Sequence, residues 1–219
     1  MKQATAEEAI SKVEDGMTVM IGGFMACGTP EILMDALVAK GVKDLTVIAN
    51  DTGIPDKGIC KLVAAGAIKK LIASHIGLTP LTGQLMSEGK LDVTLVPQGT
   101  LAEKIRAGGA GLGGILTPTG LGTEVAEGKK IISVQGKDYL LEEPLHADVA
   151  LLRGSIVDQE GNIFYRGTTQ NFNPLMATAA DVVIVAAEEL VTTGEIQPEN
   201  VVTPGIFVDY IVKGEYQHG

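Results

Sequence analysis

A chain of 219 residues, 45% of them hydrophobic, is long enough to bury one sizeable core, and we expect a single domain over residues 1–219. Its net charge of -10 and its aromatic content of 4% argue against non-specific binding to nucleic acids or anionic membranes. Cys27 and Cys60 are too far apart for a CxxC pair, and the chain has neither an apolar signal region nor a run of about 18 apolar residues. These features predict a soluble cytoplasmic protein without nucleic-acid or membrane partners.

The first hundred residues alternate between helical and strand-like patterns. Thr5 to Glu8 has the spacing of a capping box at the start of a helix, and the apolar residues 17–21 between glycines predict a buried strand. Pro30 suits the first turn of a helix that Gly41 ends. Further strands are predicted at 45–49, 70–73 and 92–96, and further helices at 60–65, 81–88 and 100–107, the last opened by a capping box from Thr100 to Glu103. This alternation indicates an α/β fold with a mostly parallel sheet.

The pattern changes after Gly108. Seven of the fifteen residues from 108 to 122 are glycine, which indicates a long connection within the domain. The segments 131–134 and 137–141 flank only Gln135 and Gly136, and this spacing predicts a β-hairpin and a small antiparallel patch. Later strands are predicted at 147–152, 162–165, 182–185 and 206–212.

One glycine-rich motif, residues 109–114, matches G-x-G-x-x-G. A dinucleotide site needs this motif after a strand and at the start of a helix, whereas here a predicted helix precedes it and a short strand, Ile115 and Leu116, follows. We therefore reject a nicotinamide cofactor. A mobile loop, or a loop whose N–H groups approach a ligand closely, remains.

Few side chains offer independent chemistry. None of the three histidines has ligand spacing with another, so no metal site is expected; we place His75 near a cleft, His146 on the surface and His218 in the C-terminal tail. We interpret Cys27 as a small buried residue. We interpret the remaining candidate acids as surface features, Glu88 in a solvated turn and Glu142 and Glu143 at the end of the hairpin. The sequence thus shows no activated nucleophile.

Three predicted strand ends carry unusual residues, namely 22–24, 50–53 and 97–99. Each combines glycine with a side-chain amide or with free backbone, and residues 97–100 lead into the start of a helix, which favours negative charge. Ligands of open α/β sheets bind beyond the carboxyl ends of the strands. Amides and N–H groups can orient a carbonyl or stabilise an oxyanion, but they do not transfer protons at neutral pH. The residues therefore predict half of a site, with polarising donors and no attacking group.

Several motifs together resemble the first-subunit type of family I coenzyme A transferases. The resemblance covers nearly the whole chain and rests on DGMTVMIGGF (15–24) with Gly28 and Pro30, IAND (48–51), LVPQGTLAEKIR (95–106), GAG (109–111), TPTG (117–120), NFNP (171–174) and TPG (203–205). It implies the layered α/β/α fold shared by isomerases and CoA-transferases, with residues 1–219 forming one α-subunit domain. It also implies exchange of CoA between acids of the acetate, butyrate and acetoacetate class.

The resemblance also implies how the catalytic roles are divided between two subunits. A glutamate of a β subunit would attack the acyl-CoA, in an α2β2 assembly, and CoA would be a substrate rather than a tightly bound cofactor. In this chain, Gln98 and Asn50 match amides beside the reacting carboxyl. The CoA-binding loop would contain Gly22, Gly23, Phe24, Met25, Ala26, Cys27 and Gly28. The residues 108–114 would line the entrance. The resemblance implies a second asparagine often found at residue 51, where this chain has Asp51, so a hydrogen-bond donor is replaced by an acceptor.

Two other functions stay open at this point. A sugar-phosphate isomerase on a similar fold would need a general base within this chain, and the sequence shows no convincing one. A non-catalytic protein that binds CoA would need only the loop and the polar strand ends.

Overall fold

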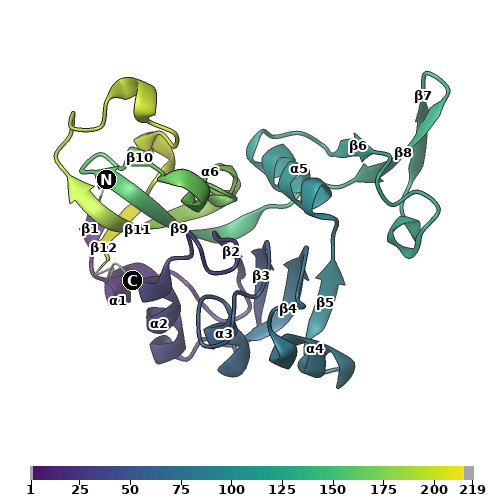
Figure 1. Cartoon of the computed structure of the whole chain (residues 1–219), viewed down its shortest axis with the longest axis horizontal. Coiled ribbons are helices and arrows are strands. Elements are labelled where there is room, and N and C mark those ends of the chain that lie inside the picture. Colours follow the sequence, from purple (N-terminus) through teal and green to yellow (C-terminus); the bar gives the residue numbers. More distant parts are fainter. Residues whose placement is uncertain (1, 215–219) are drawn as a thin grey trace.

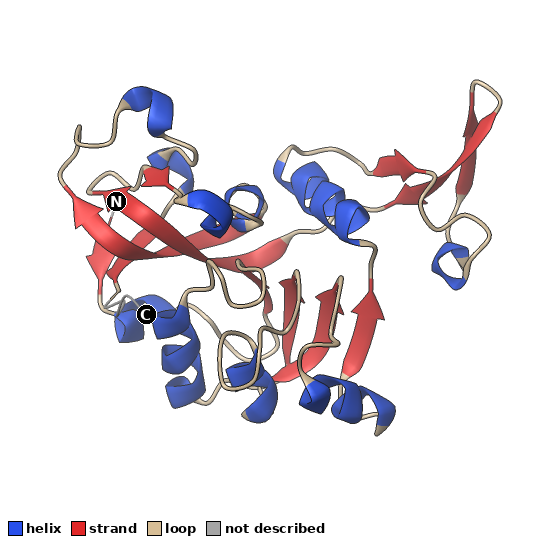
Figure 2. Cartoon of the chain, viewed as in Figure 1, coloured by secondary structure: helices blue, strands red, loops and turns tan. Residues whose placement is uncertain are grey.

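The computed structural model describes residues 2–214, and its main feature is a large, almost entirely parallel sheet (Figures 1 and 2). The strands follow the order β1-β12-β11-β9-β2-β3-β4-β5, every neighbouring pair is parallel, and only β10 runs antiparallel, against β9. The strands are β1 (Lys2–Ala4), β2 (Thr18–Ile21), β3 (Leu45–Ala49), β4 (Ile68–Ala73), β5 (Asp92–Leu95), β9 (Ala147–Asp158), β10 (Ile163–Phe164), β11 (Ala180–Val191) and β12 (Tyr210–Lys213). The predicted parallel α/β architecture is therefore confirmed.

Helices cover both faces of this sheet. One face carries α1 (Ala6–Ile10), α2 (Glu31–Lys40), α3 (Cys60–Ala64) and α4 (Pro80–Ser87), and the other carries α5 (Gln98–Gly109) and α6 (Asn173–Met176) (Figure 1). Short 3₁₀ helices occur at Glu124–Ala126, Gly167–Thr169, Pro198–Asn200 and Gly205–Phe207. The capping box at Thr5 is present, and Gly41 ends α2 in the left-handed conformation with φ 74°, both as predicted.

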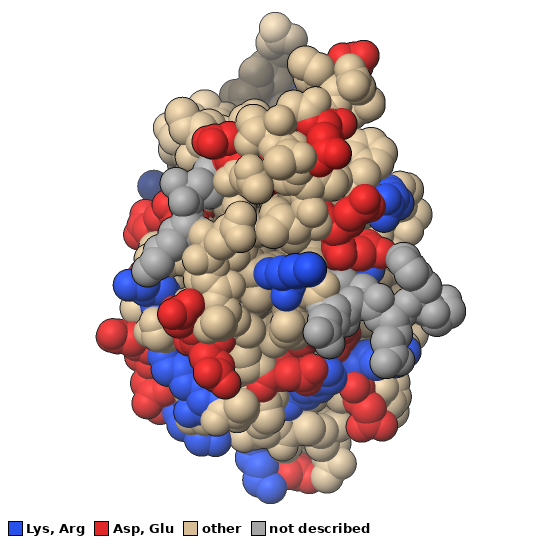
Figure 3. Space-filling view, turned by 90° about the vertical axis from the view of Figure 1, so that its left-hand side faces the viewer, with Lys and Arg blue, Asp and Glu red and all other residues tan. Residues whose placement is uncertain are grey.

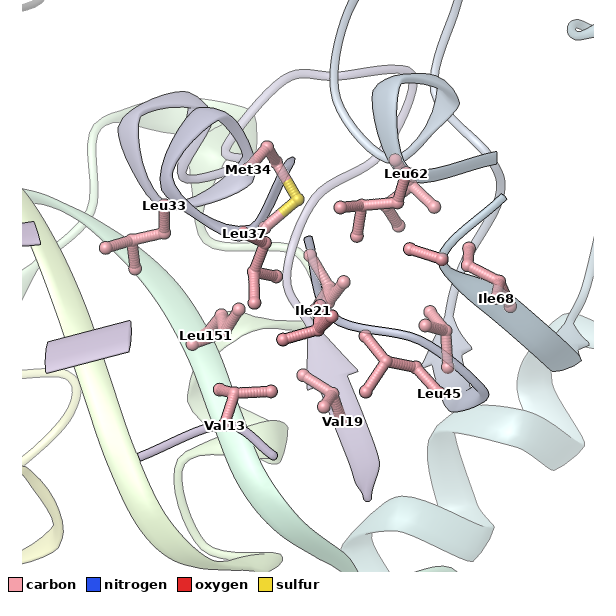
Figure 4. Close-up of a cluster of buried hydrophobic side chains, with 14 of the residues drawn as sticks. Val13, Val19, Ile21, Leu33, Met34, Leu37, Leu45, Leu62, Ile68 and Leu151 are labelled. Atoms are coloured by element: carbon pink, nitrogen blue, oxygen red, sulfur yellow. The ribbon is translucent and has the colours of Figure 1, made fainter. Parts of the chain in front are cut away.

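The strands divide their side chains between two cores. In β2, Val19 and Ile21 pack in the cluster under α1 to α4, whereas Met20 packs with α5 and α6. This alternation follows from the two-residue repeat of a strand. Figure 4 shows the first cluster, in which Leu33 and Leu37 of α2 lie over these strands. Burial on both faces explains why β2 and β3, in the middle of the sheet, are almost continuously apolar.

A second, antiparallel sheet stands away from the main sheet beyond α5 (Figures 1 and 2). Its order is β6-β8-β7, and its strands are β6 (Ile115–Thr117), β7 (Ile131–Val134) and β8 (Lys137–Glu142). Gln135 and Gly136 have φ of 50° and 76°, as the two central residues of a tight hairpin turn require. The predicted hairpin and antiparallel patch are confirmed.

Two local predictions were wrong, and one strand was missed. The helix expected from Thr100 begins at Gln98 after Pro97, so Thr100 lies inside α5 with a buried hydroxyl and caps nothing. The strand expected over 206–212 begins only at Tyr210, because the chain forms a 3₁₀ turn after Pro204 and leaves Ile206 88% exposed. The sequence analysis also missed β1, a three-residue strand paired with β12 at the edge of the sheet.

The face of the molecule shown in Figure 3 carries charged side chains of both signs, as expected for a chain with 17 basic and 27 acidic residues. Figure 3 shows acidic and basic side chains interspersed over the face that lies on the left in Figure 1, with no broad basic area on the described part of that face. That face therefore offers no extended site for phosphate backbones. Among the described residues, no helix combines the length and apolar character needed to cross a membrane.

Candidate active site

The candidate site lies where the order of the strands reverses. From β2 the sheet continues through β3, β4 and β5 on one side, whereas β9 pairs with β2 on the other side. Ligands of open α/β sheets bind beyond the carboxyl ends of the strands at such a point. The three unusual strand ends follow β2, β3 and β5, which are parallel, so all three belong to this edge (Figure 1).

At the glycines after β2, neighbouring residues of the protein occupy the space that a side chain would take. A Cβ on Gly22 would lie 1.9 Å from Asn173 Oδ1, and one on Gly23 would lie 2.0 Å from Thr29 Oγ1. A Cβ on Gly28 would lie 2.8 Å from the backbone oxygen of Thr169. The glycines are therefore required by the packing of the loop against neighbouring segments, and this space is not available to a ligand.

The tip of the loop is a tight turn, Phe24 to Cys27. The N–H of Phe24 donates to Cys27 O (2.9 Å), and the N–H of Cys27 donates to Phe24 O (2.8 Å). Between them, Met25 and Ala26 have φ of 49° and 67°, a left-handed conformation that costs an L-residue about 1–2 kcal/mol. Cys27 is exposed, so its interpretation as a small buried residue was wrong; it ends the turn on the outside, with Sγ 3.3 Å from Thr168 Oγ1.

An apolar hollow lies beside this turn. It has a volume of about 530 Å³ and is lined by Phe24, Met25, Cys27, Thr168 and Asn171. Phe24 is 41% exposed and Met25 47% exposed, although large apolar side chains are normally buried. The size and apolar lining are typical of a small-molecule site. The loop therefore offers a ligand its side chains rather than its glycines.

The structure brings Gln98 and Asn50 together at the neighbouring strand ends. Gln98 is the first residue of α5, and its Nε2 donates to Asn50 Oδ1 at 2.7 Å. Asn50 is only 2% exposed, and Ser74 Oγ donates to the same Oδ1 at 2.9 Å. Asn50 thus lies behind Gln98 and holds its amide. Within the described part of the chain, the second Nε2 hydrogen of Gln98 has no partner, so the exposed amide can donate to a ligand.

Two asparagines that the sequence analysis noted only within the NFNP run hold the loop in place. Asn171 accepts the N–H of Gly23 at 3.1 Å and donates to Cys27 O at 3.0 Å. Asn173 donates to Gly28 O at 3.1 Å and accepts the N–H of Arg153 at 3.1 Å. Their spacing of two residues, directly before Pro174 at the start of α6, was a signal that could have marked them as loop anchors.

Other sequence candidates lie outside this group. The motif 109–114 follows α5 and precedes β6, the reverse of a dinucleotide site, and Gly108 and Gly109 are needed because α5 packs against Leu145 and Thr178. That residues 108–114 line an entrance stays a prediction. His75 and His146 are exposed, and His218 lies outside the described residues. No group of three or more metal-ligating side chains occurs in residues 2–214.

Glu142 is not the surface residue that we expected. It is 1% exposed at the end of β8 and accepts from Lys104 Nζ at 2.9 Å and from Lys129 Nζ at 2.5 Å. Burial alone would raise the pKa of Glu142, but the hydrogen bonds from the two lysines outweigh it and hold that pKa below the usual value of a glutamate. Since Lys104 belongs to α5, this ion-pair group ties the small sheet to the helix that carries Gln98.

Comparison with known proteins matches residues 3–214 to the family described as coenzyme A transferase. The chain is 54% identical over 211 residues to acetate CoA-transferase subunit alpha of Escherichia coli K12, covering 96% of each chain. It is 58% identical over 207 residues to the acetoacetyl-CoA:acetate/butyrate CoA transferase alpha subunit of Clostridium acetobutylicum, covering 94% of this chain and 95% of that one.

A solved structure shares the fold. The acyl-CoA transferase YdiF from E. coli O157:H7, in its thioester complex with CoA, superposes with a TM-score of 0.85 at 24% identity. The match covers 99% of this chain and 48% of YdiF, so the chain spans about half the length of that protein. From the family match and the two relatives together, the chain belongs to the coenzyme A transferase family.

Proposed function

We propose that the chain is the α subunit of an enzyme that exchanges CoA between short-chain carboxylic acids of the acetate, butyrate and acetoacetate class. Two relatives that are 54% and 58% identical to it over nearly their whole length carry the names of such α subunits. The observation that carries the proposal is the exposed amide of Gln98, held by Asn50 and linked through Asp51 to the turn beside the apolar hollow. In this arrangement the hollow would take the acyl-CoA and Gln98 would contact the reacting carbonyl.

The attacking group would come from a β subunit. Asp51 belongs to the Asn50–Gln98 group, but it is 5% exposed and accepts three N–H donors, so it cannot act as a nucleophile. Glu188 and Glu189 are ion-paired with Arg153 and Arg166. A carboxylate from a partner subunit would complete the site, and we propose an α2β2 assembly.

The chemistry then needs no tightly bound cofactor. The partner's glutamate attacks the thioester carbonyl, the C–S bond breaks, and CoA leaves as the thiolate with an acyl-glutamyl anhydride behind it. The thiolate attacks the glutamyl carbonyl, releases the first acid and forms a glutamyl-CoA thioester, which the second acid converts back by the same steps. Each attack passes through an oxyanion. A donor such as Gln98 Nε2 stabilises such an anion and can contribute about 100- to 1000-fold in rate.

Reconstitution tests the proposal. We expect the chain co-purified with its β subunit to transfer CoA from acetyl-CoA to butyrate or acetoacetate, and the chain alone to be inactive, because it lacks the nucleophile. Absence of transfer in a properly assembled complex would contradict the proposal, and CoA binding by that inactive complex would favour a non-catalytic role. Turnover of ribose 5-phosphate by the chain alone would favour an isomerase.

A substitution in the same complex tests the role of Gln98. Gln98→Ala should lower kcat roughly 10- to 1000-fold, because it removes a donor to the oxyanion. Gln84→Ala is the matched control, since the Gln84 side chain is exposed on α4 and, among the described residues, bonds only to Glu88. An unchanged rate in Gln98→Ala would remove this residue from the site.

A further inference from the structure

Asp51 lies where three segments of the site meet. It is 5% exposed, and its Oδ2 accepts the N–H of Met25 at 2.9 Å and the Nδ2 of Asn50 at 2.7 Å. Its Oδ1 accepts the N–H of Gly53 at 2.6 Å. A carboxylate offers lone pairs to all three donors, whereas an asparagine has one oxygen and would face a donor with its own NH2 group. Both oxygens of Asp51 are therefore engaged within this chain.

The first branch from Asp51 leads to the tip of the loop after β2. Met25 and Ala26 are in the left-handed region, which persists only where the surroundings determine it. The bond from Met25 N–H to Asp51 is the contact that reaches the tip from another strand end. Met25 is one of the two exposed apolar side chains of the hollow, so Asp51 holds the backbone of a residue that a ligand would meet.

The second branch leads to Gln98. Because Asn50 Nδ2 donates to Asp51, the Oδ1 of Asn50 must point the other way, where it accepts from Ser74 and Gln98. Reversal of the Asn50 amide would place its NH2 group against Gln98 Nε2 and break that bond. The orientation of the Gln98 amide thus depends on Asp51, two hydrogen bonds away.

We propose that Asp51 is a positioning residue that couples the Phe24–Cys27 turn to the amide of Gln98. The inference rests on the proposed function, since it assigns the turn to acyl-CoA and Gln98 to the oxyanion. In this proposal one buried carboxylate holds both the Phe24–Cys27 turn, which would contact the coenzyme, and the Gln98 amide, which would donate to the reacting carbonyl. Loss of Asp51 should therefore weaken acyl-CoA binding through Met25 and slow the reaction through Gln98.

A double-mutant cycle in the assembled complex tests this coupling. Asp51→Ala should lower kcat and raise KM for acyl-CoA, each by roughly 5- to 50-fold, the effect of losing buried hydrogen bonds. Gln98→Ala should lower kcat alone. The double variant should keep the kcat of Gln98→Ala and the KM of Asp51→Ala, because Asp51 affects kcat only through Gln98. Asp51→Asn, which retains one acceptor oxygen, should fall between Asp51→Ala and the unchanged protein.

Thr82→Val is the matched control for a general loss of stability. Thr82 is fully buried and bonds to Thr52 beside Asp51, but it contacts neither Met25 nor Gln98. It should lower Tm and leave kcat and KM unchanged. Multiplicative effects on kcat in the double variant, or Asp51→Ala kinetics like those of Thr82→Val, would overturn the inference.

A measurement independent of activity separates this inference from the proposed function. Amide hydrogen exchange at Met25 and Gly53 should be faster in Asp51→Ala and unchanged in Thr82→Val, even if the complex transferred no CoA. In that case the proposed function would fail while the positioning role of Asp51 stood. Unchanged protection of Met25 in Asp51→Ala would overturn the positioning role itself.

Discussion

Gly22 lies against a side chain that cannot move aside without loss. Asn173 Oδ1, which a Cβ on Gly22 would meet at 1.9 Å, also accepts the N–H of Arg153, while its Nδ2 donates to Gly28 O and Thr169 O. Both ends of the Asn173 amide are therefore in use. Gly22 therefore allows the loop after β2 to pack directly against Asn173 at the start of α6, and this contact sets the position of the loop.

Gly22→Ala should consequently destabilise the complex by about 1–3 kcal/mol, the range for overpacked sites, and raise KM for acyl-CoA by displacing the loop. Gly83→Ala is the matched control, because nothing lies within 4 Å of a Cβ at that exposed helical position. There we expect a gain of up to about 1 kcal/mol from helix propensity. Urea unfolding at fixed protein concentration measures both. Equal effects of the two substitutions would contradict the role given to Asn173.

Individual residues also show where the sequence was a poor guide. The spacing around Gln98 and Asn50 marked strand ends correctly, because strand and helix periods are local properties. The burial of Glu142 depends instead on Lys104 and Lys129, which reach it from other segments, and Cys27 is exposed at the end of a tight turn that stands out from the sheet edge. Nothing in the local pattern carries that information.

At the scale of elements, α5 connects the small sheet to the site. It begins with Gln98, and further along it Lys104 bonds to Glu142 through its side chain and to Leu145 through its carbonyl oxygen. The sequence predicted this helix but started it at Thr100, since the capping-box spacing there competes with the start that Pro97 sets. That difference of two residues decides whether Gln98 stands on the helix or in a loop.

Glu142 should make the stability of this connection depend on pH. Its pKa is lowered in the folded protein, so its contribution is present above the unfolded value of about 4.3 and is lost as pH falls through the folded pKa. At pH 7, Glu142→Gln should cost about 1–3 kcal/mol, because it sets an NH2 group against one of two lysines. Below about pH 4 the difference from the unchanged protein should shrink.

Glu143→Gln provides the control for that experiment. Glu143 is the exposed neighbour of Glu142, and its substitution should change stability by less than about 0.5 kcal/mol at any pH. Unfolding curves collected from neutral to acidic pH compare the three proteins. A Glu142→Gln deficit that stays constant down to the acid limit would contradict the lowered pKa.

At the scale of the whole molecule, the sequence predicted the architecture well. The alternation of strands and helices and the hairpin at Gln135 and Gly136 are confirmed, because burial on two faces and turn chemistry leave direct traces in sequence. The strand order, and with it the reversal of that order beside β2, could not be predicted. It depends on the pairing of β2 with β9, which lie more than a hundred residues apart in the sequence. The site depends on that pairing, which places Asn171 and Asn173 against the loop.

We propose above that this chain holds and polarises the acyl-CoA while a β subunit supplies the nucleophile. Incubation of the assembled complex with acyl-CoA, without an acceptor acid, should accumulate the covalent glutamyl-CoA thioester. Digestion at mildly acidic pH and peptide mass spectrometry would locate it. We expect the CoA adduct on a glutamate of the β subunit and none on this chain, and a CoA thioester on a carboxylate of this chain would contradict the proposed division of roles.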